Sequence, residues 1–260
     1  MSNETKLSRY NDLVYRVNHC SHTDECSKSI KVQLCEGCNE VNLWTYWEGG
    51  RDRLDAEIML VGQDWGHIPD LDATRKALEK AGDARGGLGY RNMFPSPVFD
   101  TDVNLGKLFR QIEGCDDVES DYLNEGRKCK KVFFTNFVCC YRVGNTSGGF
   151  GKNWTKNCSG YFRELVDIIQ PKTIICLGRK AFDSVLAAAG VPKIKGKYND
   201  IILSGAVNVS FEDTKVNVYP VAHPGAMGTL NRCYAKDNAS KEISHAKGLE
   251  LQQNDWKKIK

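Results

Sequence analysis

Three polar residues of types that enzymes use in catalysis each follow an apolar segment typical of a buried strand. Asp64 lies in Gly62-Gln63-Asp64, Asn136 ends the stretch FFTN, and His223 begins His-Pro-Gly. A carboxylate or an imidazole can transfer a proton, and an amide can both donate and accept hydrogen bonds. The carboxyl ends of parallel strands meet at one edge of a sheet, so the three side chains predict an assembled active site. The alternative is ordinary strand-to-helix turns, in which Asp, Asn and Gly are common caps.

The cysteines form a second set of chemically active residues. The chain has 11 of them, and its first twenty residues contain no apolar segment typical of a secretory signal. Many cysteines without such a signal point away from a disulfide framework and toward metal ligation or redox chemistry. Cys35 and Cys38 form a Cys-x-x-Cys pair, and Cys20 and Cys26 could complete a self-contained zinc knuckle with them. Thiolates suit iron–sulfur clusters and zinc alike, so spacing alone does not separate these two.

Length and composition predict one globular domain without a membrane segment. The chain has 260 residues, of which 41% are apolar and 27% charged, enough for one well-packed core. Its longest apolar runs are far shorter than the roughly 20 residues that span a bilayer. The formal charge of +3 is compatible with a phosphate-backbone partner but does not demand one. We therefore expect a cytoplasmic location.

The elements that must position these residues alternate between strands and helices. Apolar runs in which apolar and polar residues do not alternate predict buried parallel strands. The segments between these runs are long enough for crossover helices. The predicted strands are Glu57 to Val61, Lys131 to Thr135, Thr173 to Leu177 and Val216 to Val221. The predicted helices are Leu71 to Ala81, Val103 to Glu113, Cys158 to Ile169 and Arg179 to Ala189. This order predicts a three-layer α/β/α sandwich around a small, mainly parallel four-stranded sheet.

Four short motifs carry a resemblance to a known family. VGQDWG, FFTNFVCCYR, PKTIICLGRKAF and YPVAHPGAM resemble, in this order, the landmarks of the uracil-DNA glycosylase superfamily, from about Cys35 to Arg232. The resemblance implies a monofunctional enzyme that hydrolyses the N-glycosidic bond of uracil in DNA, because no lysine stands in a matching nucleophile position. It places the glycosylase-like domain at residues 1–235, with a cysteine-bearing segment at 1–50 and a polar, basic extension at 236–260. A monomer is enough to act on one extruded nucleotide.

The cysteines resemble those of family 4 of this superfamily. In that family a cysteine pair near the amino terminus and two later cysteines hold a [4Fe–4S] cluster. The resemblance assigns Cys35, Cys38, Cys140 and Cys158 to the cluster, which would tie the amino-terminal segment to the loop after the second strand. A structural zinc on these thiols is the alternative.

The same resemblance assigns residues to the flipped base. Asn136 would read uracil, because one amide complements the O4 acceptor and the N3–H donor, whereas cytosine presents the opposite pattern. Gly62 and Gln63 belong to the loop beside it. Phe94 resembles the aromatic residue on which the base stacks, with Phe99 as the alternative.

Two residues would carry the chemistry. His223 resembles the histidine that donates a hydrogen bond to uracil O2, and Asp64 resembles the aspartate that orients the attacking water. Gln63-Asp64 looks like the GQDPY motif of family 1, whereas family 4 members usually have GEAPG. Gly66 stands where family 1 has the aromatic residue that blocks thymine. A glycosylase for other deaminated bases, such as hypoxanthine or xanthine, is therefore one alternative, and a uracil-DNA-binding protein without turnover is another.

Three further residues are expected to contact DNA. Met227 follows the histidine motif and resembles the apolar wedge that fills the gap left by the flipped base. Thr101 and Arg232 are candidates for phosphate contacts, although such residues are more often solvated surface.

Overall fold

Five strands form the central sheet, one more than the sequence predicts. The computed structural model of the chain describes residues 3–20, 29–30, 53–64, 100–115, 132–139, 141–142 and 152–260. The strand order in the sheet is β3-β2-β5-β7-β6. The bounds are Ile58–Gly62 for β2, Val132–Asn136 for β3, Thr173–Leu177 for β5, Val207–Phe211 for β6 and Thr214–Val221 for β7.

The four predicted strands are the parallel part of this sheet. β2 pairs in parallel with β3 and β5, and β5 pairs in parallel with β7. Every residue of β2, β3 and β5 is buried, as expected for strands covered on both faces. The prediction of a mainly parallel sheet is confirmed. All four strands therefore deliver the residues that follow them to the same edge.

The additional strand, β6, lies at the edge and runs antiparallel to β7. The two form a hairpin in which Phe211 pairs with Thr214. Its burial alternates, with Val209 and Phe211 buried and Asn208 and Ser210 exposed. This alternation is typical of an edge strand that faces solvent on one side.

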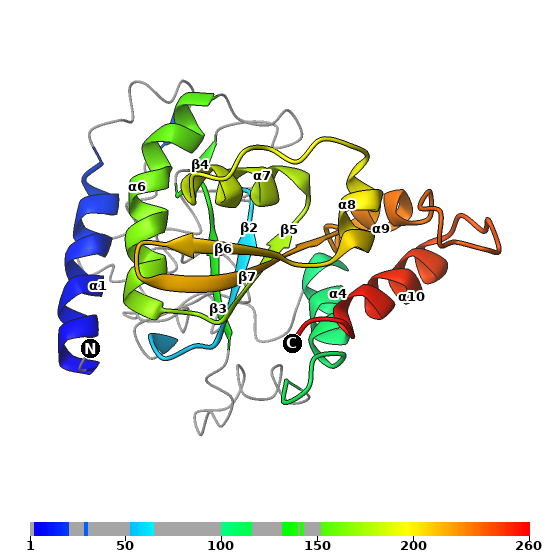
Figure 1. Cartoon of the computed structure of the whole chain (residues 1–260), viewed down its shortest axis with the longest axis horizontal. Coiled ribbons are helices and arrows are strands. Elements are labelled where there is room, and N and C mark those ends of the chain that lie inside the picture. The colour runs from blue at the N-terminus through cyan, green and yellow to red at the C-terminus, as the bar shows by residue number, and fades with distance from the viewer. Residues whose placement is uncertain are drawn as a thin grey trace, which may run out of the picture.

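Helices cover both faces of the sheet, which confirms the α/β/α class. Their bounds are Asn3–Asn18 for α1, Asp100–Phe109 for α4, Lys152–Ile169 for α6, Arg179–Ala188 for α7, Tyr198–Ser204 for α8, Ala226–Arg232 for α9 and His245–Trp256 for α10. Figure 1 shows α1 and α6 on one side of the sheet and α4 and α10 on the other. Alternate residues of β2 face opposite sides of the sheet, so Met59 and Val61 belong to one buried cluster, and Ile58 and Leu60 belong to the other.

The polar carboxyl-terminal segment belongs to this core. Helix α10 contacts α9, α4 and β7. Trp256 at its end is fully buried and meets the ring of Phe109 edge-on, with centroids 5.3 Å apart. The segment that the sequence presents as an extension therefore closes one face of the sheet.

The amino-terminal segment pairs with the chain after β3 in a second, two-stranded sheet. Ser29–Ile30 (β1) pairs antiparallel with Tyr141–Arg142 (β4). The helix predicted at Leu71 to Ala81 lies outside the described residues. Among the helices of the described ranges, none has the length and apolarity needed to cross a membrane.

Candidate active site

The carboxyl ends of β2 and β3 bring Asn136 against the loop that contains Asp64. Gly62 is paired with Asn136 at the end of the two strands. Beyond the strands, Phe137 N–H donates to the Gly62 carbonyl at 2.9 Å, and Val138 N–H donates to the Gln63 carbonyl at 3.1 Å. The two loops are thus fixed to each other by backbone hydrogen bonds.

Gly62 leaves room for the Asn136 amide. A Cβ atom on Gly62 would overlap with Oδ1 of Asn136, so any larger residue would displace the amide. The Asn136 side chain is only 5% exposed. A buried amide at the sheet edge, with donor and acceptor on one group, is suited to read the edge of a planar ligand.

Asp64 is held by its neighbour in sequence. The Gln63 side chain donates from Nε2 to Oδ1 of Asp64 at 2.9 Å, and both residues are partly exposed. A neutral amide fixes the orientation of the carboxylate without adding a charge. Asp64 therefore lies at the edge where Asn136 ends its strand, in a position that water can reach.

His223 reaches the same edge from β7. The Gly178 N–H, just after β5, donates to the Val221 carbonyl at 2.9 Å. Gly178 has a φ of 89°, a conformation that glycine adopts without strain. This turn continues the β5–β7 pairing up to the residues that precede His223.

The hydrogen bond at Nδ1 determines which imidazole nitrogen can donate. Gly225 N–H points at Nδ1 of His223, 3.0 Å away. A peptide N–H can only donate, so Nδ1 must accept, and the neutral ring carries its proton on Nε2. Part of the residue is solvent-exposed, yet the surrounding protein desolvates the ring enough to lower the pKa of His223. His223 is thus a neutral donor through Nε2 near pH 7.

Thr101 and Met227 lie beside this histidine loop. A Cβ atom on Gly225 would come within 3.0 Å of both His223 Nδ1 and Thr101 Oγ1, so the Thr101 hydroxyl of α4 borders the loop. Met227 projects from the start of α9 and is 70% exposed. Both side chains remain candidates for DNA contact.

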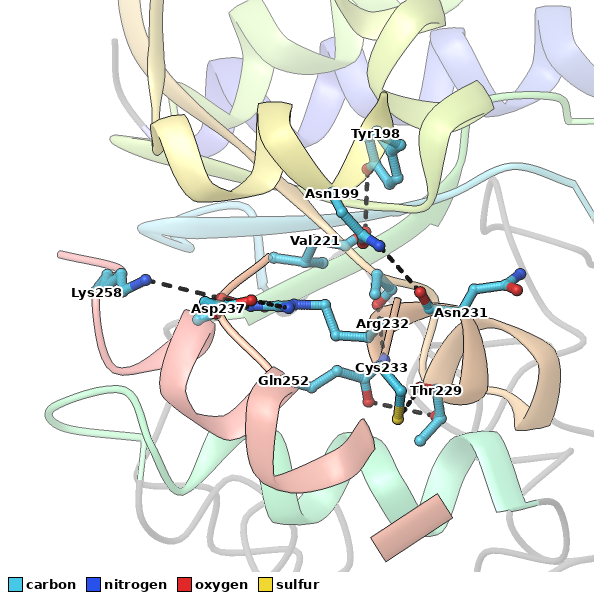
Figure 2. Close-up of polar contacts among 12 residues, drawn as sticks. Tyr198, Asn199, Val221, Thr229, Asn231, Arg232, Cys233, Asp237, Gln252 and Lys258 are labelled. Carbon is cyan, nitrogen blue, oxygen red and sulfur yellow. Dashed lines mark hydrogen bonds and ion pairs between the residues drawn. The ribbon is translucent and has the colours of Figure 1, made fainter. Parts of the chain in front are cut away.

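Arg232 does not have the position predicted for it. Its side chain is 0% exposed, and Nε lies 2.6 Å from Oδ2 of Asp255. Two more of its nitrogens contact the Asp237 carboxylate, each at 2.7 Å, as Figure 2 shows in part. Because its guanidinium is buried between two carboxylates, a phosphate cannot reach it. The predicted phosphate contact is wrong, and Arg232 instead ties α9 to the carboxyl-terminal segment.

Three of the described cysteines, Cys20, Cys139 and Cys158, lie where the end of α1, the loop after β3 and α6 meet. Cys158 on α6 is buried, and a hydrogen bond with the Cys139 thiol lowers the pKa of Cys158 against the opposing effect of burial. Burial and a hydrogen bond with Cys20 raise the pKa of Tyr161. Within the described ranges, no three Cys, His, Asp or Glu side chains stand close enough together to hold a metal.

Several predicted site residues lie outside the described residues. They are Cys35, Cys38, Cys140, Phe94 and Phe99, together with Cys26, Trp65 and Gly66. The structure therefore brings Gly62, Gln63, Asp64, Asn136 and His223 to one edge of the sheet. Behind His223, Asn104 donates to the Pro224 carbonyl at 2.8 Å, the Thr229 hydroxyl lies 3.2 Å from the same carbonyl, and Gln252 donates to the His223 carbonyl at 3.1 Å. The sequence did not predict this support, because nothing in the local sequence marks these residues.

Comparisons with known proteins identify the superfamily to which the chain belongs. The model of the uracil DNA glycosylase superfamily matches residues 50–243. A type-5 uracil-DNA glycosylase from Pyrobaculum aerophilum is 24% identical over 212 residues, which cover 80% of this chain and 84% of that protein. That relative is named as type 5, so the finer resemblance to family 4 is not confirmed.

Proposed function

The chain belongs to the uracil DNA glycosylase superfamily, and we propose that it is a monofunctional glycosylase that removes uracil from DNA by hydrolysis. One observation carries this proposal: the Asn136 amide, the Asp64 carboxylate and a neutral His223 imidazole are held at the same edge of the sheet. The Pyrobaculum relative supports uracil as the base. A monomer suffices for this reaction.

Asn136 would select the base. The N-glycosidic bond inside a duplex is out of reach, so the nucleotide must first be flipped into a pocket. There the Asn136 amide would donate to uracil O4 and accept from N3–H. Cytosine has a donor in place of O4 and an acceptor at N3, so both groups of the amide would lack a partner. Each unpaired buried group costs about 1–3 kcal/mol. Gly62 makes this possible, since its missing side chain leaves the space that the amide occupies. Phe94 is proposed to stack on the base.

His223 would stabilise the leaving group. When the bond between C1′ and N1 breaks, its electron pair goes to uracil, which becomes an anion with charge on N1 and O2. A hydrogen bond from Nε2–H of His223 to O2 is strongest when this charge has developed, so it accelerates the reaction rather than ground-state binding. The Gly225 N–H at Nδ1 keeps Nε2 as the donor.

Asp64 would act on the sugar side. The departure of uracil leaves an oxocarbenium-like sugar, which a nearby carboxylate stabilises. A water molecule oriented by Asp64 adds to C1′ and gives up its proton to the carboxylate, which serves as general base. The uracil anion then takes up a proton from solvent and Asp64 releases its proton to solvent, which leaves free uracil and an abasic site with the DNA backbone intact. Gln63 holds the carboxylate in place.

Met227 and Thr101 are proposed to contact the DNA. Apolar side chains inserted between base steps hold distorted DNA, and the exposure of Met227 fits this use. The Thr101 hydroxyl borders the histidine loop, and we propose that it binds a phosphate beside the flipped nucleotide.

We also propose that a [4Fe–4S] cluster is held by Cys35, Cys38, Cys140 and Cys158, of which Cys158 alone lies in the described part of the chain. Cys158 is buried beside the Cys139 thiol, and the β1–β4 pairing runs the segment that precedes Cys35 alongside the residues that follow Cys140. Bound there, the cluster would supply a structural link between these segments. Anaerobically purified protein should contain about four iron atoms per chain, and Cys158→Ser should lower this content. If the purified protein contains stoichiometric zinc and no iron, the four cysteines hold a structural zinc and not a cluster.

The function is tested with oligonucleotides that each carry one defined base. We expect single-turnover release of uracil, revealed as an alkali-labile abasic site, and no cleavage of control oligonucleotides with cytosine or thymine at that position. Faster release of hypoxanthine or xanthine than of uracil would show that the enzyme acts mainly on other deaminated bases. Tight binding of uracil-containing DNA without release would make the protein a binder rather than an enzyme.

A further inference from the structure

The carboxyl-terminal helix α10 holds the backbone on which His223 is mounted. Gln252 of this helix donates from Nε2 to the His223 carbonyl at 3.1 Å, and the Ala222 carbonyl lies 3.4 Å from the same nitrogen. Gln252 is 1% exposed, so water does not replace these contacts. Because the backbone at His223 sets the direction of its side chain, this amide constrains where the imidazole lies.

Helices α9 and α10 are interlocked around Gln252. The Thr229 hydroxyl of α9 lies 3.2 Å from the Pro224 carbonyl and 3.4 Å from Oε1 of Gln252, and Figure 2 shows Thr229 beside Gln252. A Cβ atom on Gly248 of α10 would overlap with the Thr229 carbonyl, so the two helices are in close contact there. The amide end of Gln252 is thus fixed from both helices.

The buried ion pair fixes the far end of the same helix. Asp255, one turn beyond Gln252, accepts from Nε of Arg232 at 2.6 Å, and its side chain is 5% exposed. Arg232 ends α9, the helix that begins just after the histidine motif. The ion pair thus helps to fix α10 against α9, while Gln252 of α10 touches the histidine loop itself.

We propose that Gln252 is a positioning residue for the glycosylase reaction, which places the His223 imidazole by hydrogen bonding to the backbone of Ala222 and His223. The inference rests on the proposed function, which it deepens. The family match ends at residue 243, and α10 begins at His245. The support for His223 therefore comes from a segment that this match does not reach.

The test compares substitutions at two neighbouring positions of α10. Gln252→Leu keeps the side-chain size and removes both amide contacts, and Gln252→Glu keeps the acceptor for Thr229 but removes the donor. Gln253→Leu is the control, since Gln253 is partly exposed on the same helix. Single-turnover cleavage of a uracil oligonucleotide gives the rate, and binding of a cleavage-resistant 2′-fluoro analogue gives the affinity.

We expect both Gln252 variants to cleave about 10–100-fold more slowly, because misplacement by about 1 Å can cost a hundredfold. The affinity should change by less than about threefold, and Gln253→Leu should match the wild type. Gln252 is not a positioning residue if either folded variant cleaves at the wild-type rate. Equal losses in rate and affinity would also overturn the proposal, since they indicate uniform binding.

A second readout does not depend on activity. In ¹H–¹⁵N spectra of the imidazole, the wild type should show the proton on Nε2, and both Gln252 variants should increase the share of the Nδ1–H tautomer, because the Gly225 N–H is no longer held in line with Nδ1. An unchanged tautomer in both variants would overturn the proposal. If the wild type releases no uracil, the proposed function fails, while these spectra still show whether Gln252 places His223.

Discussion

Substitution of Gly62 by alanine adds a methyl group where the Asn136 amide lies. The new Cβ would be closer to Oδ1 of Asn136 than 3.0 Å, whereas ordinary van der Waals contact begins at 3.4 Å. The amide must therefore move by roughly 1 Å to regain ordinary contact, because the next neighbours of this Cβ are Cγ of the same amide at 3.4 Å and the buried ring of Phe134 at 3.5 Å. A displacement of this size in a positioning contact costs on the order of 100-fold in rate.

The same substitution should also reduce stability. Insertion of a methyl group into a packed site typically costs about 1–3 kcal/mol. Gly62→Ala should therefore remain folded, with a free energy of unfolding that is lower than that of the wild type by about this amount. Gly160→Ala is the matched control, since a Cβ there meets nothing within 4 Å. It lies within α6, where alanine should add about 0.5–1 kcal/mol of stability.

The assay is single-turnover release of uracil with enzyme in excess, next to urea unfolding of the same preparations. Gly62→Ala should be slowed about 100-fold, and Gly160→Ala should keep the wild-type rate. The reasoning would be refuted if Gly62→Ala, shown to be folded, released uracil within about threefold of the wild type, because the Asn136 amide would then not need its present position.

Three further outcomes are expected. Arg232→Met should lower the free energy of unfolding by about 3–5 kcal/mol in urea, because it leaves Asp255 buried without the arginine that pairs with it. A loss below about 1 kcal/mol, together with a weaker salt dependence of DNA binding, would instead indicate that Arg232 contacts a phosphate. The pKa of His223 in the folded chain is lower than the ordinary histidine pKa of about 6.5, so below this pH the unfolded chain binds a proton at His223 more readily than the folded chain. As the pH falls from 7.5 to 5, the melting temperature of the wild type should therefore drop more than that of His223→Ala. Parallel melting curves for the two proteins would contradict this. Met227→Ala should slow cleavage in duplex DNA about tenfold more than in single strands if Met227 fills the gap left by the base, whereas equal effects on both substrates would argue against insertion.

The parallel part of the sheet could be predicted because its strands are buried on both faces. Short continuous apolar runs such as those of β2 and β5 are typical of strands in the middle of a parallel sheet, and their predicted bounds agree with the structure to within a residue or two. The edge strand β6 was missed because a short alternating segment, half exposed, resembles a loop as much as a strand. Helix α10 was not predicted because its residues are mostly polar and few large apolar side chains, namely Leu249, Leu251 and Trp256, indicate burial.

The candidate site was predictable where strand ends determine it and unpredictable where packing does. Asp64, Asn136 and His223 follow buried strands, so the parallel sheet alone places them at one edge. The burial of Arg232 could not be predicted, because Asp255 is brought to it only by the packing of α10 on α9, while Asp237 reaches it through the turn that follows α9. The same packing places Gln252 behind the histidine loop.

The most direct test of the central claim is single-turnover release of uracil from one oligonucleotide by the wild type, Asp64→Asn and His223→Ala, with binding of the cleavage-resistant analogue measured in parallel. The account predicts uracil release by the wild type, and rates lowered much more than affinities in both variants, because each side chain stabilises charge that exists only in the transition state. Release by both variants at the wild-type rate would contradict it, since the edge of the sheet that holds Asp64, Asn136 and His223 would then not be the active site.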